Sequence, residues 1–219
     1  MIIKAVLFDF DGVIANTLTY HVQAWQQVFA AHGVEILADD VCLLEGQLAE
    51  EIGRQLAQQK GVSLSEYALR EMVRQKRAIY NQITQAMVYP AARRLIDYLK
   101  ENAIKIALVT GALRQNVETV TGKEFLTQFD VIIAGNDVAR TKPHPDPYLA
   151  AAEKLHVPPS NCLVIENAPL GIRAAKEAGM FCVALKTTIH DNAQLSEADM
   201  ILENMNDLLH DDLLSQLFG

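Results

Sequence analysis

The chain of 219 residues has few cysteines and few aromatic side chains. Its three cysteines, Cys42, Cys162 and Cys182, lie far apart and show no metal-ligand spacing. An odd number of scattered cysteines argues against a disulfide framework, and Cys162 and Cys182 each begin an apolar run, as small core residues do. The cysteine pattern therefore predicts neither a disulfide scaffold nor a zinc site.

Positive charge and long apolar runs are also scarce. The 19 Lys and Arg against 27 Asp and Glu give a formal net charge of −8. Nucleic acids and membrane surfaces are anionic, so this balance argues against both as partners. No apolar stretch approaches the about 20 residues that cross a bilayer, and the amino terminus reaches Asp9 too early for a signal peptide. We expect a cytoplasmic protein that acts on a small molecule and needs no obligate protein partner.

What the sequence does contain is a large apolar fraction arranged in short runs. Hydrophobic residues make up 50% of the chain, which is ample for a buried core. The runs are apolar continuously rather than alternately, as in strands that helices cover on both faces. They alternate with helical patterns and so predict an α/β fold with a Rossmann-like, doubly wound parallel sheet. The predicted strands are Ile2–Phe8, Ile104–Val109, Val131–Ala134, Cys162–Ile165, Phe181–Leu185 and Met200–Leu202.

Only helical patterns occur between residues 17 and 88. We predict helices at Thr19–His32 and Leu48–Lys60, and a third opened by the capping box Ser63-Leu-Ser-Glu66. Helices inserted directly after the first strand predict an all-helical cap domain, residues 16–88, on a core domain of residues 1–15 and 89–219.

Polar residues of distinct chemical types follow the predicted strands. In parallel α/β sheets the ligand lies beyond the carboxyl ends of the strands, so these positions are candidate site residues. Acids and small polar residues also begin loops and cap helices, but that explains four such strand ends poorly. The positions are Asp9 and Asp11, Thr110-Gly111, Lys142 in the loop after Val131–Ala134, and Glu166-Asn167.

The sequence Asp9-Phe10-Asp11-Gly12-Val13 closes the first strand. A carboxylate such as Asp9 can attack phosphorus and form an aspartyl-phosphate. Asp11 can protonate the leaving oxygen and later activate water. Gly12 would let the backbone turn sharply and approach a phosphate. A cation must screen the carboxylate from the phosphate, and Mg²⁺ suits carboxylate and phosphate oxygens.

These motifs resemble the haloacid dehalogenase superfamily of phosphotransferases, and specifically its β-phosphoglucomutase-like members. The resemblance spans essentially the whole chain, with four motifs in order. It implies that Thr110 holds the transferring phosphate and that Lys142 neutralises charge around nucleophile and phosphate. It also implies that Glu166 and Asn167 form the acidic motif that binds magnesium with Asp9 and Asp11.

Each of these roles has a physical basis. Thr110 can donate its hydroxyl to a phosphate oxygen, and Gly111 leaves backbone N–H groups accessible beside it. Lys142 can stabilise the charge on the transferring oxygens. Glu166 can ligate magnesium, directly or through water, or it can pair with Lys142. Asn167 stands where many relatives have Asp, so the site has one negative charge fewer than theirs.

The resemblance to the sugar-phosphate mutase also covers the first cap helix. Thr17, His21 and Trp25 stand at matching positions on one helix face. In the mutase the histidine holds the acid/base Asp inactive until the cap closes. Ordinary packing of an amphipathic helix is the alternative for His21 and Trp25, and it is favoured for Trp25.

The chain departs from the mutase after Gly46. The mutase has an arginine there for a second phosphate, whereas this chain has Ala49 followed by two acids. Carboxylates would repel a phosphate, so a substrate with one phosphate and a hydroxyl-rich remainder fits better, with Gln47 available to bind hydroxyls. Arg114 is either a partial substitute for the missing arginine or a surface residue.

These observations favour a magnesium-dependent phosphatase acting on a small phosphorylated metabolite such as a sugar phosphate. A β-phosphoglucomutase is the alternative, and a non-catalytic phosphometabolite-binding protein is a remote one. Asp11 argues against a dehalogenase, since displacing a halide needs no leaving-group acid. A phosphonatase would need a reactive cap lysine, and the sequence around Lys60 and Lys76 marks neither as buried.

Overall fold

The computed structural model describes residues 2–218. Its centre is a six-stranded parallel sheet with the strand order β3-β2-β1-β4-β5-β6. This confirms the predicted fold class, and each predicted strand is present with ends shifted by at most a few residues. The strands are β1 (Ala5–Phe8), β2 (Lys105–Val109), β3 (Val131–Ile133), β4 (Cys162–Glu166), β5 (Phe181–Leu185) and β6 (Met200–Leu202).

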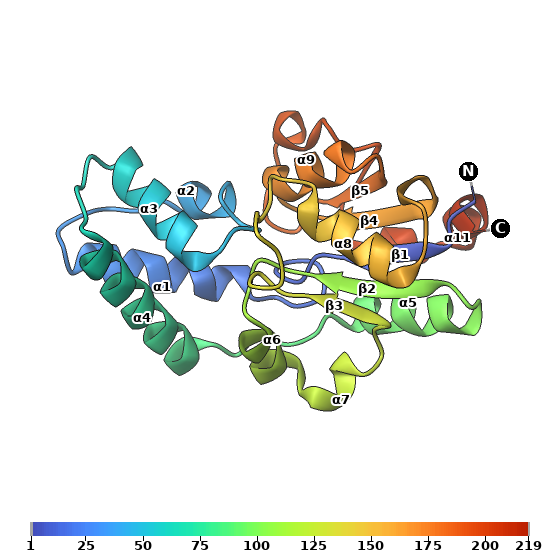
Figure 1. The fold of residues 1–219 in the computed structure, drawn as a ribbon, viewed down its shortest axis with the longest axis horizontal. Coiled ribbons are helices and arrows are strands. Elements are labelled where there is room, and N and C mark those ends of the chain that lie inside the picture. The colour runs from blue at the N-terminus through green and yellow to red at the C-terminus, as the bar shows by residue number, and fades with distance from the viewer. Residues whose placement is uncertain (1, 219) are drawn as a thin grey trace.

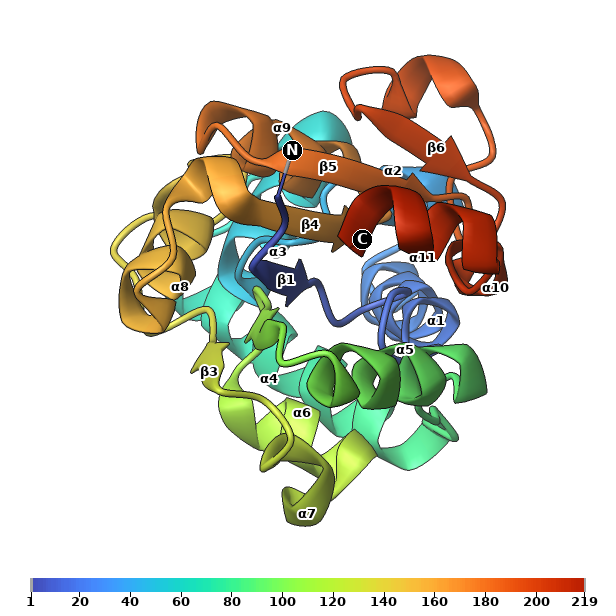
Figure 2. The ribbon, with the colours of Figure 1, turned by 90° about the vertical axis from the view of Figure 1, so that its right-hand side faces the viewer.

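Helices cover both faces of the sheet (Figure 2). In β1, Ala5 and Leu7 point into one apolar cluster, while Val6 and Phe8 point into the other. This alternation on a strand that is buried on both faces explains its continuously apolar sequence. The first cluster includes α8 (Asp146–Leu155) and α9 (Pro169–Glu177); the second includes α5 (Pro90–Glu101), α6 (Arg114–Thr121), α7 (Lys123–Leu126), α10 (Met205–Leu208) and α11 (Asp211–Phe218). Two short 3₁₀ helices, Pro159–Asn161 and Asn192–Leu195, complete the elements.

Four helices follow β1 and lie together beyond one end of the sheet (Figure 1). They are α1 (Leu18–Ala30), α2 (Ala38–Cys42), α3 (Ala49–Gln59) and α4 (Glu66–Ile83). The sequence did not predict α2, which is only five residues long. The predicted capping box was misplaced: Ser65, not Ser63, caps α4, with its hydroxyl accepting from the Ala68 N–H at 3.2 Å.

The two connections between these helices and the sheet run side by side. Ala15 forms an antiparallel bridge with Val88. The Tyr89 N–H donates to the Ile14 carbonyl at 2.9 Å, and the Asn16 N–H donates to the Met87 carbonyl at 3.2 Å. We propose that this paired crossing, where the chain enters and leaves the four helices, is the boundary of a cap domain of residues 16–88.

Candidate active site

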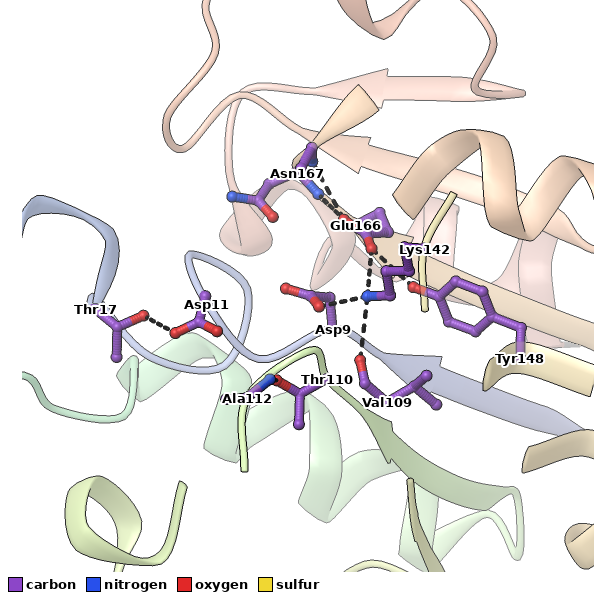
Figure 3. Close-up of polar contacts among 11 residues, drawn as sticks. Asp9, Asp11, Thr17, Val109, Thr110, Ala112, Lys142, Tyr148, Glu166 and Asn167 are labelled. Carbon is purple, nitrogen blue, oxygen red and sulfur yellow. Dashed lines mark hydrogen bonds and ion pairs between the residues drawn. The ribbon is translucent and has the colours of Figure 1, made fainter. Parts of the chain in front are cut away.

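Asp9, Lys142 and Glu166 meet at the carboxyl ends of β1 and β4 (Figure 3). The Lys142 ammonium donates to Asp9 Oδ1 at 2.5 Å, to Glu166 Oε1 at 2.7 Å and to the Val109 carbonyl at 3.2 Å. Tyr148, from α8, donates its hydroxyl to the same Glu166 oxygen at 2.8 Å. The lysine side chain is 1% exposed. One buried cation is therefore held between the carboxylates of two strands, and the structure brings together Asp9, Lys142 and Glu166, three of the candidate site residues.

Burial and neighbouring charges shift the pKa values of Asp9 and Lys142. Burial, together with the nearby charges of Glu166 and Asp11, raises the pKa of Asp9 to about 8, against the opposing effect of Lys142. Burial would lower the pKa of Lys142, but the charges of Asp9 and Glu166 outweigh it and raise that pKa. Lys142 therefore stays protonated, and a further cation beside Asp9 would favour the ionised form of this carboxyl.

Gly12 and Thr110 shape the space in front of Asp9. Gly12 has a φ of +82°, and a Cβ there would lie 2.3 Å from the Asn167 amide nitrogen, so only glycine fits this turn. The Thr110 hydroxyl oxygen accepts from the Ala112 N–H at 3.0 Å. Its proton is thus free to be donated elsewhere, as a phosphate ligand requires.

Asp11 is held by two residues from the start of the cap. Thr17 donates its hydroxyl to Asp11 Oδ1 at 2.6 Å, and His21 Nε2 lies 3.2 Å from the same oxygen. Burial acts to raise the pKa of Asp11, but these hydrogen bonds and the charge of Lys76 outweigh it and lower the pKa. The acid/base candidate is thus kept as a carboxylate in this arrangement.

His21 connects Asp11 to Lys76 of α4. Lys76 Nζ lies 2.6 Å from His21 Nδ1. Burial and the charge of Lys76 lower the pKa of His21, so the imidazole is neutral. An ammonium can only donate, so Nδ1 accepts and Nε2 carries the proton that faces Asp11. The three groups form one directed chain of hydrogen bonds from Lys76 through His21 to Asp11.

The residues near Asp9 leave oxygens that suit a magnesium ion. Asn167 Oδ1 is buried and accepts no hydrogen bond from residues 2–218, while its Nδ2 donates to the Thr188 hydroxyl at 2.9 Å. Asp9 Oδ2 also receives no hydrogen bond from this part of the chain. An orphaned buried acceptor beside a free carboxylate oxygen fits a hard cation or one of its water ligands. Within the described residues, no group of three or more His, Cys, Asp or Glu side chains gathers as a metal cluster.

Glu166 is less free than Asn167. Its Oε1 accepts from Lys142 and Tyr148, and its Oε2 accepts from the Asn167 N–H at 2.9 Å and the Ala168 N–H at 3.2 Å. Both oxygens are thus occupied by protein donors. Of the roles that the sequence left open for Glu166, pairing with Lys142 is the one that this geometry supports.

A cavity lies between the cap and the sheet, directly beside Asp11. Gly46 of the cap has a φ of +96°, and a Cβ there would lie 2.8 Å from Lys142 Cδ. A Cβ on Gly111 would lie 2.5 Å from the Gly46 carbonyl. The cap loop at Gly46 therefore touches the loops that carry Lys142 and Gly111. The cavity is lined by Asp11, His21, Glu45, Gly46, Gln47, Leu48, Ala49, Ile52, Lys76, Arg77, Gly111, Ala112, Leu113 and Asn116.

The remaining predicted site residues divide into two groups. Gln47 lines the cavity; its Oε1 accepts from Gln55 at 2.7 Å, which leaves its two N–H donors available. Trp25 is fully buried and packs near Phe29 and Lys76 rather than at the cavity wall, which fits core packing. Arg114 is half exposed and donates to the Ile132 carbonyl at 3.1 Å, which fits the surface alternative.

The two acids after Ala49 do not face a substrate in the way that the sequence suggested. Glu50 pairs with Arg77 at 3.0 Å. Glu51 caps the start of α3 through the Leu48 N–H and accepts from the Thr141 hydroxyl at 2.5 Å. Arg77 thus balances the charge of Glu50, and protein donors bind one carboxylate oxygen of Glu51. The cap has Ala49 rather than an arginine at this point.

The comparisons with known proteins agree with this geometry. Residues 6–185 match the haloacid dehalogenase-like hydrolase family. The chain is a haloacid dehalogenase-like hydrolase.

Relatives of this hydrolase carry names that indicate phosphoryl chemistry. The validoxylamine A 7'-phosphate phosphatase of Streptomyces hygroscopicus subsp. limoneus is 35% identical, over 94% of this chain and 95% of its own. The β-phosphoglucomutase of Bacillus subtilis is 30% identical, over 94% and 91%. The solved structure of β-phosphoglucomutase from Clostridium difficile superposes with a TM-score of 0.83 at 29% identity, covering 98% of this chain and 96% of that one. No helix among residues 2–218 of the hydrolase is long and apolar enough to cross a membrane.

The sequence did not predict three residues that lie at the candidate active site of this hydrolase. Tyr148 supports Glu166, and Glu45 lines the cavity. The sequence around Lys76 does not indicate burial, yet Lys76 is only 5% exposed, and burial lowers its pKa to about 8. A signal for Lys76 was present: it shares the apolar face of α4 with Met72, Val73 and Tyr80, where an unpartnered lysine is rare.

Proposed function

We propose that this hydrolase is a Mg²⁺-dependent phosphatase that acts on a small phosphorylated metabolite of the sugar-phosphate type. The observation that carries the proposal is the contact between Lys142 and Asp9 at 2.5 Å, with Asp11 held two residues further on. A nucleophilic carboxylate, a buried cation beside it and a separate acid/base group are the parts that phosphoryl transfer through an aspartyl-phosphate requires. The name of the 35%-identical relative, a phosphate phosphatase, supports the same class.

In the first step, Asp9 attacks the phosphorus atom and the bond to the leaving oxygen breaks. Lys142 and the Thr110 hydroxyl stabilise the oxygens of the transferring group. Asp11 donates a proton to the leaving oxygen. Mg²⁺ held by Asp9 and Asn167 would supply charge screening between the carboxylate and the incoming phosphate.

In the second step, Asp11 accepts a proton from water, which attacks the aspartyl-phosphate and releases inorganic phosphate. Asp11 must therefore be protonated in the first step and ionised in the second. The hydrogen bonds from Thr17 and His21 favour the ionised form. A cap movement that separates Thr17 and His21 from Asp11 would weaken these bonds and let Asp11 take up a proton, so cap motion would couple proton supply to the binding of substrate.

A β-phosphoglucomutase is the second candidate, and the His21 contact with Asp11 is the observation that favours it. The cap loop offers no free arginine for a second phosphate. Arg77, the guanidinium that lines the cavity, is held by Glu50 at 3.0 Å. Hydrolysis is therefore the better supported reaction.

The test is a phosphate-release screen over phosphorylated sugars, nucleotides and glycolytic acids, with and without added Mg²⁺. The proposal expects release from sugar phosphates only when Mg²⁺ is present. Conversion of β-glucose 1-phosphate to glucose 6-phosphate without free phosphate would establish the mutase instead. Failure to release phosphate from any ester, p-nitrophenyl phosphate included, would favour a binding protein.

A further inference from the structure

Glu45 is an acidic residue on the cavity wall that the proposed chemistry does not use. It lies in the loop between α2 and α3, directly before Gly46, and is 7% exposed. It lines the cavity together with Asp11, Gln47 and Lys76. In the part of the chain that the structure describes, no side chain or backbone group forms a hydrogen bond or ion pair with its carboxylate. The carboxylate is thus nearly buried, unpartnered and open to the cavity.

The nearby cations do not satisfy this acid. Lys76 Nζ points to His21 Nδ1 at 2.6 Å, and no ion pair joins it to Glu45 within residues 2–218. Arg77 is paired with Glu50. Burial and the charge of Asp11 raise the pKa of Glu45 to about 8, although Lys76 acts in the opposite direction. Without a ligand, Glu45 avoids the cost of a buried charge by taking up a proton, whereas a bound cation would supply the counter-charge that keeps it ionised.

We propose that Glu45 selects the substrate by binding an ammonium group, so that the preferred substrate is an amino-substituted phosphomonoester such as an amino-sugar phosphate. This inference rests on the proposed phosphatase function and adds the chemical class of the substrate's alcohol part, which carries an amino group. A hydroxyl would give Glu45 a hydrogen bond, but only a cation also neutralises its charge in a site shielded from water.

Two neighbours complete the recognition of such a substrate. Gln47 has its oxygen engaged by Gln55 and presents N–H donors, which suit hydroxyl groups of the same molecule. The Gly46 loop touches Lys142 and Gly111, so Glu45 stands on the cap side of the phosphate position. The same carboxylate would repel a second phosphate or a carboxylate on the substrate.

The experiment compares kcat/KM within matched pairs: glucosamine 6-phosphate against glucose 6-phosphate, galactosamine 1-phosphate against galactose 1-phosphate, and phosphoethanolamine against 2-hydroxyethyl phosphate. The wild-type enzyme with Mg²⁺ is expected to prefer the amino member of at least one pair by about tenfold or more. Glu45→Gln should reduce that ratio to near one, mainly through the amino member. Because each ratio is internal to a pair, a general loss of activity cancels.

Glu35→Gln is the matched control, since Glu35 is an exposed acid in the same cap. It should keep the wild-type ratio. A wild-type ratio near one in every pair, or an unchanged ratio in Glu45→Gln, would overturn the inference. So would an enzyme that hydrolyses p-nitrophenyl phosphate and neutral sugar phosphates but no amino member. An enzyme inactive on every ester, p-nitrophenyl phosphate included, would instead contradict the phosphatase proposal beneath it.

Discussion

Lys76 Nζ and His21 Nδ1, which lie 2.6 Å apart, decide which nitrogen of the imidazole faces Asp11. The ammonium has no lone pair, so His21 must accept at Nδ1 and present its Nε2 proton to the acid/base carboxylate. The ring is further fixed by stacking on Tyr80 at a centroid distance of 4.3 Å. The protonation of Asp11 thus depends on a residue of α4 that does not touch it.

We expect Lys76→Met to raise the pKa of His21. The burial of the ring, which also lowers this pKa, would remain, but the charge of Lys76 would be gone. An NMR titration of the His21 ring measures the change directly. Lys60→Met is the control, since Lys60 pairs with Asp40 elsewhere in the cap. A His21 pKa that is the same in both variants and the wild type would show that the Lys76 contact does not govern it.

Asp11→Asn should separate the two chemical steps. With p-nitrophenyl phosphate the leaving group departs without an acid, so Asp9 can still be phosphorylated. Hydrolysis of the intermediate then lacks its base and should slow by about 100-fold or more. Stopped-flow absorbance should therefore show one equivalent of p-nitrophenol per enzyme, followed by slow turnover. A variant with slow release and no burst would mean that Asp11 acts in the first step only.

Asn167→Asp should tighten magnesium binding, by about tenfold, because a carboxylate replaces the amide oxygen next to Asp9. Thr188, which now accepts from Asn167 at 2.9 Å, can turn its hydroxyl to donate instead. Calorimetric titration of the apoprotein with Mg²⁺ measures the change without reference to activity. Equal affinities in variant and wild type would remove residue 167 from the metal's surroundings.

Glu45→Gln should stabilise the protein without ligand, and more so as the pH rises. The pKa of Glu45 is raised from 4.5 to about 8, so between these values the folded state binds more protons than the unfolded state. Stability from this group is therefore lost as the pH rises through that window. The variant and the wild type should melt together near pH 4.5. By pH 8 the variant should melt higher, by roughly 2–4 °C for each kcal/mol gained. A difference that is constant with pH would contradict the raised pKa.

The sequence was sufficient to predict the sheet and the strand-end residues. Strands such as Cys162–Glu166 are apolar at every position before the last because helices cover both faces, and this pattern is visible locally. Since parallel strands end at one edge, Asp9 and Glu166 could be expected to meet before any contact was known. The pairing of Lys142 with both of them follows from the same placement.

The cap was harder to predict, because its site residues are defined by contacts between distant segments. Lys76 becomes part of the site only through His21, 55 residues earlier in the chain. Glu50 and Glu51 look like repulsive acids in the sequence. In the structure Glu50 pairs with Arg77, and Glu51 accepts a hydrogen bond from the Thr141 hydroxyl. Glu45, for which residues 2–218 supply no such partner, cannot be distinguished from them without the fold.

The central claim is that Asp9 becomes phosphorylated during turnover. Its most direct test is acid quenching of the Asp11→Asn variant during reaction with p-nitrophenyl phosphate and Mg²⁺, followed by mass spectrometry of the peptide that contains Asp9. The account predicts one phosphoryl group on Asp9, and none when Asp9→Asn is combined with the same change. An unmodified peptide during turnover, or phosphate release that survives in Asp9→Asn, would contradict it.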